Sequence, residues 1–250
     1  MRRVQLGVEY DGSNFAGLQV QAKGERTVQG VLEAALAKIP GAVPKITAAG
    51  RTDAGVHALE MSLHYDTEDR IPIERVPLAL NALLPPDVRV RWARPRPMDF
   101  DARKSARWRA YRYRLLLRPE PSALLSRYAL WVPHRLDLDA LREGLGHFLG
   151  EHDFAAFANQ EARPTRRRIL HAGLRLEGEE AWIELVGTGF VRGQVRVMVG
   201  TLLEVAQKKR PPEDIPRLLA GKNRAEAGPT APPQGLYFVA AGYRPWPAGR

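Results

Sequence analysis

The order of its periodic segments is the feature of this chain that most limits its possible folds. Residues 4–10 alternate between apolar and polar side chains, and the run ends at Asp11-Gly12. Alternation with a period of two is typical of a strand, whereas apolar residues three and four apart are typical of a helix. The first hundred residues therefore predict strand, helix, strand, strand, helix and strand. These segments cover residues 4–10, 28–39, 45–49, 59–67, 73–84 and 87–94.

This is the element order of a ferredoxin-like domain, in which two helices cover one face of an antiparallel sheet. The rest of the chain predicts the same order with insertions. Its expected strands cover residues 107–117, 169–176, 181–186 and 236–243, and its expected helices cover residues 137–149, 190–205 and 212–219. The sequence thus predicts an α+β fold of two ferredoxin-like (RRM-like) halves, with domains at residues 1–105 and 106–250.

An excess of positive charge indicates a polyanionic partner. The chain has 250 residues and a formal net charge of +10, and arginine supplies 31 of its 38 basic residues. Residues 88–118 hold eleven basic residues against two acidic ones, and a second cluster contains Arg163, Arg166, Arg167 and Arg168. A compositional bias toward arginine would raise the charge without clustering it, so the clustering favours a nucleic acid.

The absence of cysteine restricts both the chemistry and the compartment. It excludes disulfides, thiolate zinc sites and cysteine nucleophiles, and it suits a cytoplasmic protein. No apolar run approaches the 18 residues of a membrane span, and the first residues lack the apolar segment of a signal peptide. We therefore expect a cytoplasmic protein that does not cross a membrane.

The segment from Ala48 to Ala58 concentrates reactive side chains in a stretch without periodicity. It contains Arg51, Asp53 and His57, and Gly50 and Gly55 free the backbone on both sides of the aspartate. An apolar alternating run follows directly, so this segment is expected to be a loop that leads into a strand. The residues alone also fit a tight turn in which the Asp53 carboxylate bonds its own backbone.

Residues 50–58 resemble the signature of the bacterial tRNA pseudouridine synthases that modify the anticodon arm. Five further collinear stretches resemble the same family, at residues 10–19, 27–36, 100–113, 190–205 and 228–237. The resemblance implies that the two sheets join into one extended sheet with helices on one face and a central active-site cleft. It also implies a cofactor-free homodimer that acts on tRNA positions 38, 39 and 40. Uracil is detached from C1′ of its ribose, turned, and rejoined through C5.

Within that resemblance, Asp53 matches the catalytic aspartate. Attack on C1′, addition to C6 of uracil and removal of a sugar proton all remain open for it. A hydrolytic glycosidase would need a pair of carboxylates, and no second acid stands in a motif. Arg196 matches the basic residue of the late helix, and we expect it to pair with Asp53 and keep this carboxylate ionised.

Tyr111 matches the tyrosine that stacks on the target base, and its hydroxyl could also move a proton. A core tyrosine is the alternative, and Tyr113, on the same face of the expected strand, is our choice for the core role. Arg51 precedes the catalytic aspartate by two residues. A target base inside a stem must leave the helix. The resemblance implies that Arg51 fills the gap left by the base, rather than holding a phosphate.

We also expect RNA contacts from the central connector and from the second basic cluster. These residues are Phe100, Asp101, Ala102, Arg103, Lys104, Arg163, Arg166, Arg167 and Arg168. The chain departs from the family pattern at Asp101, at Lys104 and at the pair Gly193-Gln194. None of these departures touches Asp53, Tyr111 or Arg196.

Two other functions compete with the isomerase. Charge and aromatic residues would equally serve an RNA chaperone without catalysis, but such a protein gains nothing from a carboxylate in a basic cleft. A metal-dependent nuclease would need several convergent acidic ligands. His57 and His64 are seven residues apart without a nearby third ligand, which favours structural histidines over metal ligands. Activity in excess EDTA separates the isomerase from the nuclease.

Overall fold

The computed structural model describes residues 1–22, 24–159 and 164–247, which form a mixed α+β fold. The predicted α+β class is therefore confirmed. The chain divides into two compact units, residues 1–109 with 237–250, and residues 110–236. The expected domain boundary at residue 105 stays a prediction. Residues 237–250 belong to the first unit, although they end the chain, because the last strand pairs with a strand of that unit.

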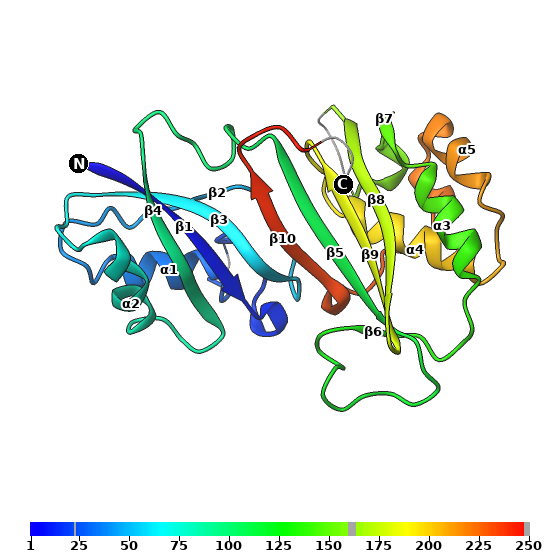
Figure 1. Ribbon diagram of the computed structural model, residues 1–250, viewed down its shortest axis with the longest axis horizontal. Coiled ribbons are helices and arrows are strands. Elements are labelled where there is room, and N and C mark those ends of the chain that lie inside the picture. Colours follow the sequence, from blue (N-terminus) through cyan, green and yellow to red (C-terminus); the bar gives the residue numbers. More distant parts are fainter. Residues whose placement is uncertain (23, 160–163, 248–250) are drawn as a thin grey trace. The chain divides into compact units, whose positions relative to one another are not determined.

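The first unit is built on three antiparallel strands in the order β4-β1-β3. Helices α1 and α2 cover one face of this sheet (Figure 1). The apolar side chains of β1 at Val4, Leu6 and Val8 are fully buried, as its alternating sequence predicts. The bounds are β1 (Arg2–Tyr10), α1 (Val28–Leu36), β3 (His57–Thr67), α2 (Val76–Asn81) and β4 (Val88–Arg96).

Two short strands share the remaining edge of β3. β2 (Thr47–Ala48) pairs antiparallel with β3 at His64 and Leu63, and β10 (Leu236–Gly242) pairs parallel with it at His57 and Ala58. The prediction of purely antiparallel sheets is therefore wrong. β10 returns from the far end of the chain and not through a hairpin, so its direction is not set by a neighbouring turn.

The helix boundaries of the first unit follow local chemistry. The Thr27 side chain accepts a hydrogen bond from the Gly30 backbone N–H at 3.2 Å and so caps α1. Residues 73–84, expected as one helix, form the 3₁₀ turn η2 (Ile73–Arg75) followed by the shorter α2. Pro77 lies in the first turn of α2, where its missing N–H costs no hydrogen bond.

The second unit contains a sheet with the strand order β5-β9-β8-β7. The predicted hairpin is confirmed as β8 and β9, and Gly178 turns it with a φ of 60°. The pattern missed β6, which pairs parallel with β5, and β7, since strands of two and four residues are too short to show a period. The bounds are β5 (Trp108–Leu116), β6 (Leu130–Trp131), β7 (Gly150–Asp153), β8 (Arg166–Glu177) and β9 (Glu180–Gly187).

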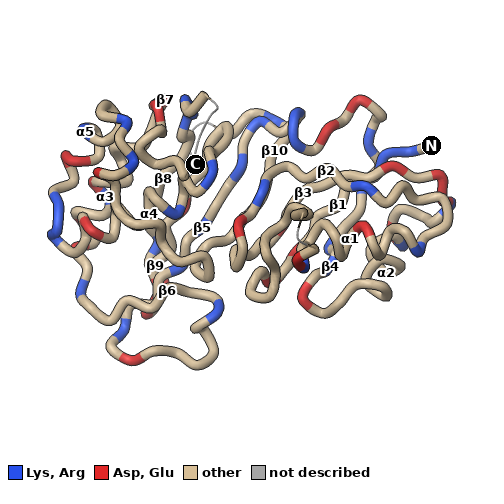
Figure 2. Tube along the Cα trace, turned by 180° about the vertical axis from the view of Figure 1, so that it is seen from behind, with Lys and Arg blue, Asp and Glu red and all other residues tan. Residues whose placement is uncertain are grey.

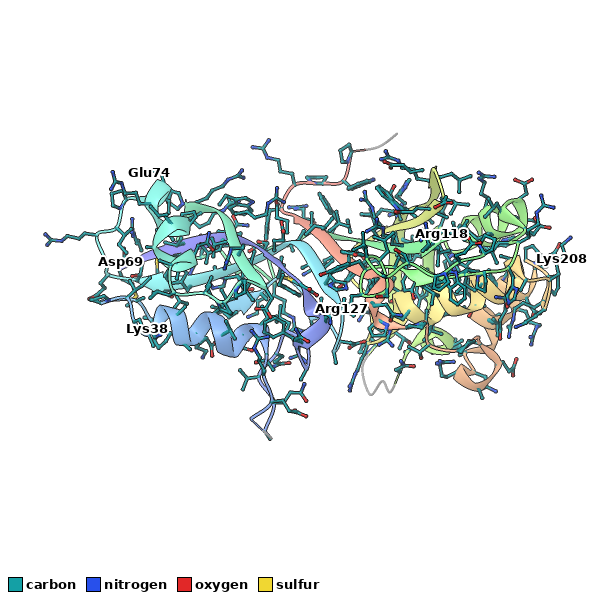
Figure 3. The ribbon with its side chains drawn as sticks, turned by 90° about the horizontal axis from the view of Figure 1, so that it is seen from below. Lys38, Asp69, Glu74, Arg118, Arg127 and Lys208 are labelled. Atoms are coloured by element: carbon teal, nitrogen blue, oxygen red, sulfur yellow. The ribbon has the colours of Figure 1, made fainter. Side chains whose placement is uncertain are left out.

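Helices α3 (Leu138–Gly146), α4 (Gln194–Ala206) and α5 (Asp214–Gly221) complete this unit. The Asp137 side chain caps α3, and its pKa is lowered first by the hydrogen bond from the Ala140 N–H. Lys208, labelled in Figure 3, lies just beyond α4, and its ammonium is 3.4 Å from the Asp137 carboxylate. These contacts join the end of α4 to the start of α3.

The expected helix at residues 190–205 begins four residues later than predicted. Gly193 has a φ of 74°, which is left-handed and cannot continue an α-helix. A β-carbon at Gly193 would lie 2.5 Å from Nδ2 of Asn159, so only glycine fits there. The departure at Gly193-Gln194 therefore marks the point where α4 starts.

Candidate active site

Asp53 lies in the loop between β2 and β3, as the sequence predicts. Its backbone carbonyl accepts a hydrogen bond from the Val56 N–H at 3.2 Å, which closes a turn around Gly55 at a φ of 77°. The Asp53 side chain is half-buried, whereas its neighbour Thr52 is buried. The structure thus shows a tight turn at Asp53, and the catalytic role of this residue stays a prediction.

The loop that follows β1 supports the Asp53 loop through its backbone. The Leu18 N–H donates to the Thr52 carbonyl at 3.1 Å, and the Gly55 N–H donates to the Phe15 carbonyl at 3.3 Å. A β-carbon at Gly17 would lie 2.8 Å from the Thr52 carbonyl oxygen. The two loops therefore approach so closely that the first needs glycine at this contact.

Tyr10 and Thr52, which support the Asp53 loop, were not among the predicted site residues. The Tyr10 hydroxyl and the Thr52 hydroxyl lie 2.7 Å apart in a buried hydrogen bond, so the end of β1 fixes the residue before Asp53. One signal was available, because Tyr10 continues the buried alternation of β1. The pattern could not show which loop residue its hydroxyl meets.

Two histidines of β3 accept hydrogen bonds from backbone N–H groups of other segments. The Gly12 N–H donates to Nδ1 of His57 at 3.0 Å, and the His57 ring stacks on Tyr237 with centroids 4.9 Å apart. The Ala102 N–H donates to Nδ1 of His64 at 3.1 Å. Burial, with a further contribution from Arg3, lowers the pKa of His64 and favours its neutral form. Both histidines thus have structural partners.

Within the part of the chain that the structure describes, no three His, Cys, Asp or Glu side chains are grouped to hold a metal ion. In the same part, no helix is both long and apolar enough to cross a membrane.

The connector at residues 100–104 folds into a capped turn beside β3. The Asp101 carboxylate accepts from the backbone N–H groups of Arg103 and Lys104, both at 2.8 Å. Burial acts to raise the pKa of Asp101, but these hydrogen bonds outweigh it and lower the pKa. Phe100 and Ala102 are buried, and Arg103 and Lys104 are exposed. The turn therefore presents two basic side chains.

Tyr111 and Tyr113 take different positions on β5. Tyr113 is fully buried and its hydroxyl donates to the Pro232 carbonyl at 2.7 Å, so its predicted core role is confirmed. Burial raises the pKa of Tyr113. Tyr111 is half-buried, and its ring meets the edge of Phe190 with centroids 5.0 Å apart. Tyr111 is thus the tyrosine of this strand with a partly accessible ring.

Arg196 lies in the first turn of α4 between buried valines at positions 195 and 197. Its Nε–H donates to the Ala231 carbonyl at 2.7 Å, and the Ala231 N–H donates to the Arg196 carbonyl at 3.0 Å. This reciprocal pair fixes both the backbone and the side chain of Arg196. Arg196 is half-buried, so it is not a freely exposed surface arginine.

The second basic cluster lies at the start of β8. Arg166 and Arg168 are exposed and Arg167 is half-buried. The Arg166 guanidinium lies 3.1 Å from the Glu151 carboxylate across the β7–β8 pairing, so part of its charge is compensated. Arg163 falls outside the described residues. In Figure 2 basic residues recur along both units and acidic residues accompany many of them.

The basic residues counted between positions 88 and 118 lie mainly on two strands, β4 and β5, and their surroundings differ. On β5, Arg112 pairs with Glu184 at 2.7 Å and Arg114 pairs with Glu180 at 2.5 Å. On β4, Arg94 is exposed and lies over the Trp92 ring at 4.6 Å. The charge counted along the sequence therefore overstates the charge that β5 offers to a partner, because β9 supplies carboxylates opposite it.

The candidate residues fall into two groups. Asp53 and Arg51, which is exposed, belong to the first unit, together with the connector at residues 100–104. Tyr111, Arg196 and the β8 arginines belong to the second. Asp53 and Arg196, which the sequence predicts to pair, therefore belong to different units.

Comparison with known proteins places this chain among RNA-modifying enzymes. Residues 7–103 and 145–244 match the sequence model of the family described as tRNA pseudouridine synthase. A tRNA pseudouridine synthase A from Thermus thermophilus is 57% identical over 247 residues, covering 97% of each chain. The enzymes of the same name from Methylococcus capsulatus and Caldicellulosiruptor bescii are 45% and 41% identical, over 94% and 96% of this chain and 88% and 98% of their own lengths.

Proposed function

This chain belongs to the tRNA pseudouridine synthase family, and we propose that it isomerises uridines of the anticodon stem-loop, at tRNA positions 38, 39 and 40. The relatives are named for pseudouridine formation in tRNA, so the conversion of uridine to pseudouridine in tRNA is the activity of this enzyme. The observation that carries the proposal is the Asp53 loop, a hydrogen-bonded turn with one half-buried carboxylate in a strongly basic chain.

The reaction breaks the C1′–N1 bond and forms a C1′–C5 bond, and the proton on C5 moves to solvent while N1 gains one. No atom of the base is lost, so no water needs to be added. We assign Asp53 the role of nucleophile in this sequence. One carboxylate is sufficient for it, whereas a hydrolytic glycosidase needs two.

Arg196 is the proposed ionic partner of Asp53. A guanidinium beside a carboxylate favours its charged form, which is the form that can attack. The support for this role is the fixed position of Arg196 at the start of α4, where Ala231 binds its Nε–H. Arginine suits the role because it stays protonated at every pH of interest.

Tyr111 and Arg51 are proposed to handle the flipped base. The Tyr111 ring offers a face for stacking, and its hydroxyl is the group we propose for removing the C5 proton. Arg51 is exposed beside the Asp53 loop, where it can fill the gap that the base leaves in the stem.

The tRNA backbone needs basic contacts beyond the reacting nucleotide. We propose Arg103 and Lys104, with the backbone of the turn formed by Phe100, Asp101 and Ala102, as one such contact, and Arg163 and Arg166–Arg168 as another. We further propose that the two units are ferredoxin-like halves whose sheets join around a central cleft. We also propose that the enzyme acts as a homodimer, as the resemblance implies, and in the cytoplasm, which the absence of cysteine suits.

Pseudouridine mapping of tRNA incubated with the purified protein tests this function directly. We expect new pseudouridines at positions 38, 39 and 40, formed at the same rate in excess EDTA. Pseudouridine at other positions would overturn the site assignment. Tight tRNA binding without any pseudouridine would instead identify an RNA chaperone.

A further inference from the structure

A segment of five residues, Gly228–Pro229–Thr230–Ala231–Pro232, lies against the N-terminal half of α4, and we call it the strap. A β-carbon at Gly200 would lie 1.8 Å from the Pro229 carbonyl oxygen, and one at Gly228 would lie 2.7 Å from Cα of Thr201. Neither glycine can be replaced without separating the two segments. The strap and the helix are thus in backbone contact.

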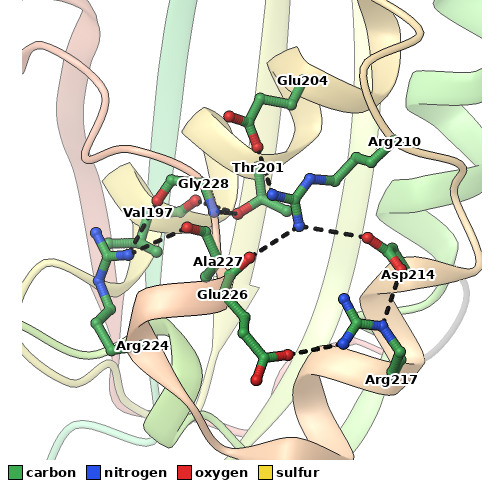
Figure 4. Close-up of polar contacts among 10 residues, drawn as sticks. All are labelled: Val197, Thr201, Glu204, Arg210, Asp214, Arg217, Arg224, Glu226, Ala227 and Gly228. Atoms are coloured by element: carbon green, nitrogen blue, oxygen red, sulfur yellow. Dashed lines mark hydrogen bonds and ion pairs between the residues drawn. The ribbon is translucent and has the colours of Figure 1, made fainter.

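Hydrogen bonds join the strap to α4 at two positions along the helix, Thr201 and Arg196. The Gly228 N–H donates to the Thr201 hydroxyl at 3.0 Å, and this hydroxyl donates to the Val197 carbonyl at 2.9 Å (Figure 4). One turn earlier, Arg196 and Ala231 exchange their reciprocal pair of hydrogen bonds. The position of the strap therefore sets the direction of the Arg196 side chain.

Arg224, in the 3₁₀ turn η4 (Arg224–Glu226), holds the strap from its other side. One Nη of Arg224 donates to the Gly228 carbonyl at 3.0 Å, and the other donates to the Thr230 hydroxyl at 3.1 Å. Its Nε donates to Oδ1 of Asn159 at 3.2 Å. The planar guanidinium thus holds the strap with two donors and Asn159 with a third, an arrangement that lysine cannot reproduce.

Asn159 extends this hold to the start of α4. Its Nδ2 donates to the Thr230 hydroxyl at 3.2 Å, and its backbone N–H donates to the Arg192 carbonyl at 2.8 Å. It also occupies the space beside left-handed Gly193. Arg224 is therefore linked to Arg196 by two routes, one through the strap and one through the start of the helix.

A separate set of ion pairs fixes η4 to the rest of the unit. Arg210 lies 2.7 Å from the Glu204 carboxylate on α4 and donates to the Glu226 carbonyl at 3.1 Å. Arg217 on α5 lies 2.7 Å from the Glu226 carboxylate and 3.0 Å from the Asp214 carboxylate (Figure 4). Arg217 thus holds the same turn as Arg224 through carboxylates outside the strap, which makes it the matched control.

We propose that Arg224 is a positioning residue for Arg196, acting through the strap. The inference rests on the proposed function, in which Arg196 pairs with the catalytic carboxylate. Arg224 holds Gly228 and Thr230, and Thr230 is the neighbour of Ala231, whose carbonyl accepts from Nε of Arg196. The Arg196 guanidinium is thereby positioned before tRNA binds. A small displacement of a charged group at a reacting centre is costly, so this hold acts on the rate of the chemical step.

Arg224→Met removes the three donors and keeps most of the side-chain volume. We expect its single-turnover rate of pseudouridine formation to fall about 10- to 100-fold, with the tRNA dissociation constant within about twofold of wild type. Arg224→Lys should have an intermediate rate, because one donor can be retained. Arg217→Ala should keep the wild-type rate. Circular dichroism and thermal unfolding of each variant establish that it is folded.

The double variant with Arg196→Lys separates positioning from a general structural effect. Lysine keeps the charge but has no Nε–H for the Ala231 carbonyl, so Arg224→Met should slow the Arg196→Lys enzyme much less than it slows the wild type. Equal slowing in both backgrounds would overturn the inference, as would a wild-type rate for Arg224→Met. A wild-type rate for Arg196→Ala would refute the role of Arg196 itself.

Discussion

Gly17 lies against the backbone of Asp53, and a β-carbon on Gly17 would come within 3.3 Å of the Asp53 carbonyl carbon. Gly17 also has a φ of 111°, a conformation that residues with a side chain rarely adopt. The loop after β1 and the loop after β2 therefore depend on each other. The backbone path of the Asp53 loop therefore depends on a residue far from it in the sequence.

Gly17→Ala tests this dependence. The substitution combines an unfavourable φ with a backbone clash, and we expect a loss of about 1–3 kcal/mol in the free energy of unfolding. The pseudouridine rate should fall as well, because the Asp53 loop must shift. Denaturant unfolding and single-turnover assays measure the two effects. Gly146→Ala in α3, where a β-carbon meets no atom within 4 Å, is the control. Wild-type stability and rate for Gly17→Ala would show that the loops adapt freely.

Tyr111→Phe and Tyr111→Ala distinguish stacking from proton transfer. Phenylalanine keeps the ring and its edge contact with Phe190, so the flipped uridine should still bind. Loss of the hydroxyl should slow the reaction by about two to four decades, which is the usual contribution of general acid–base catalysis. Alanine should in addition weaken binding of the flipped base by about 1–3 kcal/mol. A Phe variant as fast as wild type would leave Tyr111 with stacking alone.

Replacement of Arg166, Arg167 and Arg168 by alanine tests the β8 surface. tRNA binding should weaken. The slope of the logarithm of the binding constant against the logarithm of the salt concentration is negative, and it should become less steep by about 0.7–0.9 for each phosphate that the variant no longer binds. Arg166 shares its charge with Glu151, so we expect it to contribute less than Arg168, the other exposed arginine. Arg142→Ala, at an exposed ion pair on α3, is the control. A salt slope equal to that of wild type would exclude phosphate binding here.

The buried His64 makes stability depend on pH. Burial lowers its folded-state pKa below the ordinary 6.5, with Arg3 adding to this effect and Asp101 and Asp66 opposing it. A neutral histidine favoured by folding contributes stability that is complete above the unfolded pKa and is lost as the pH falls below it. The free energy of unfolding should therefore decline below pH 6.5. His64→Gln, which can still accept the Ala102 N–H, should decline less; an equal decline would assign the effect to other groups.

The sequence was sufficient for features that depend on local pattern. The alternation at Val4, Leu6 and Val8 predicts β1, and Thr27 predicts the start of α1. The Gly50–Ala58 motif predicts the loop that holds Asp53. Each of these depends only on residues that are neighbours along the chain.

Features that depend on residues far apart in the chain could not be predicted from the sequence. The pairing of Arg112 with Glu184 and the parallel pairing of Tyr237 with His57 join strands far apart in the chain. The contact that leaves no room for a β-carbon at Gly193 comes from Asn159, which lies well before it in the sequence. A period shows which face of an element is buried, but it does not show what packs there, so the supports of Asp53 and Arg196 emerged only from the structure.

Asp53→Asn tests the central claim most directly. Asparagine keeps the shape of the side chain and removes the charge that a nucleophile needs. The measurement is pseudouridine formation at tRNA positions 38, 39 and 40 under single-turnover conditions, with tRNA binding determined on the same preparation. We predict no pseudouridine above background and a tRNA affinity close to that of wild type. Appreciable turnover by the Asp53→Asn enzyme would contradict the assignment of Asp53 as the catalytic carboxylate.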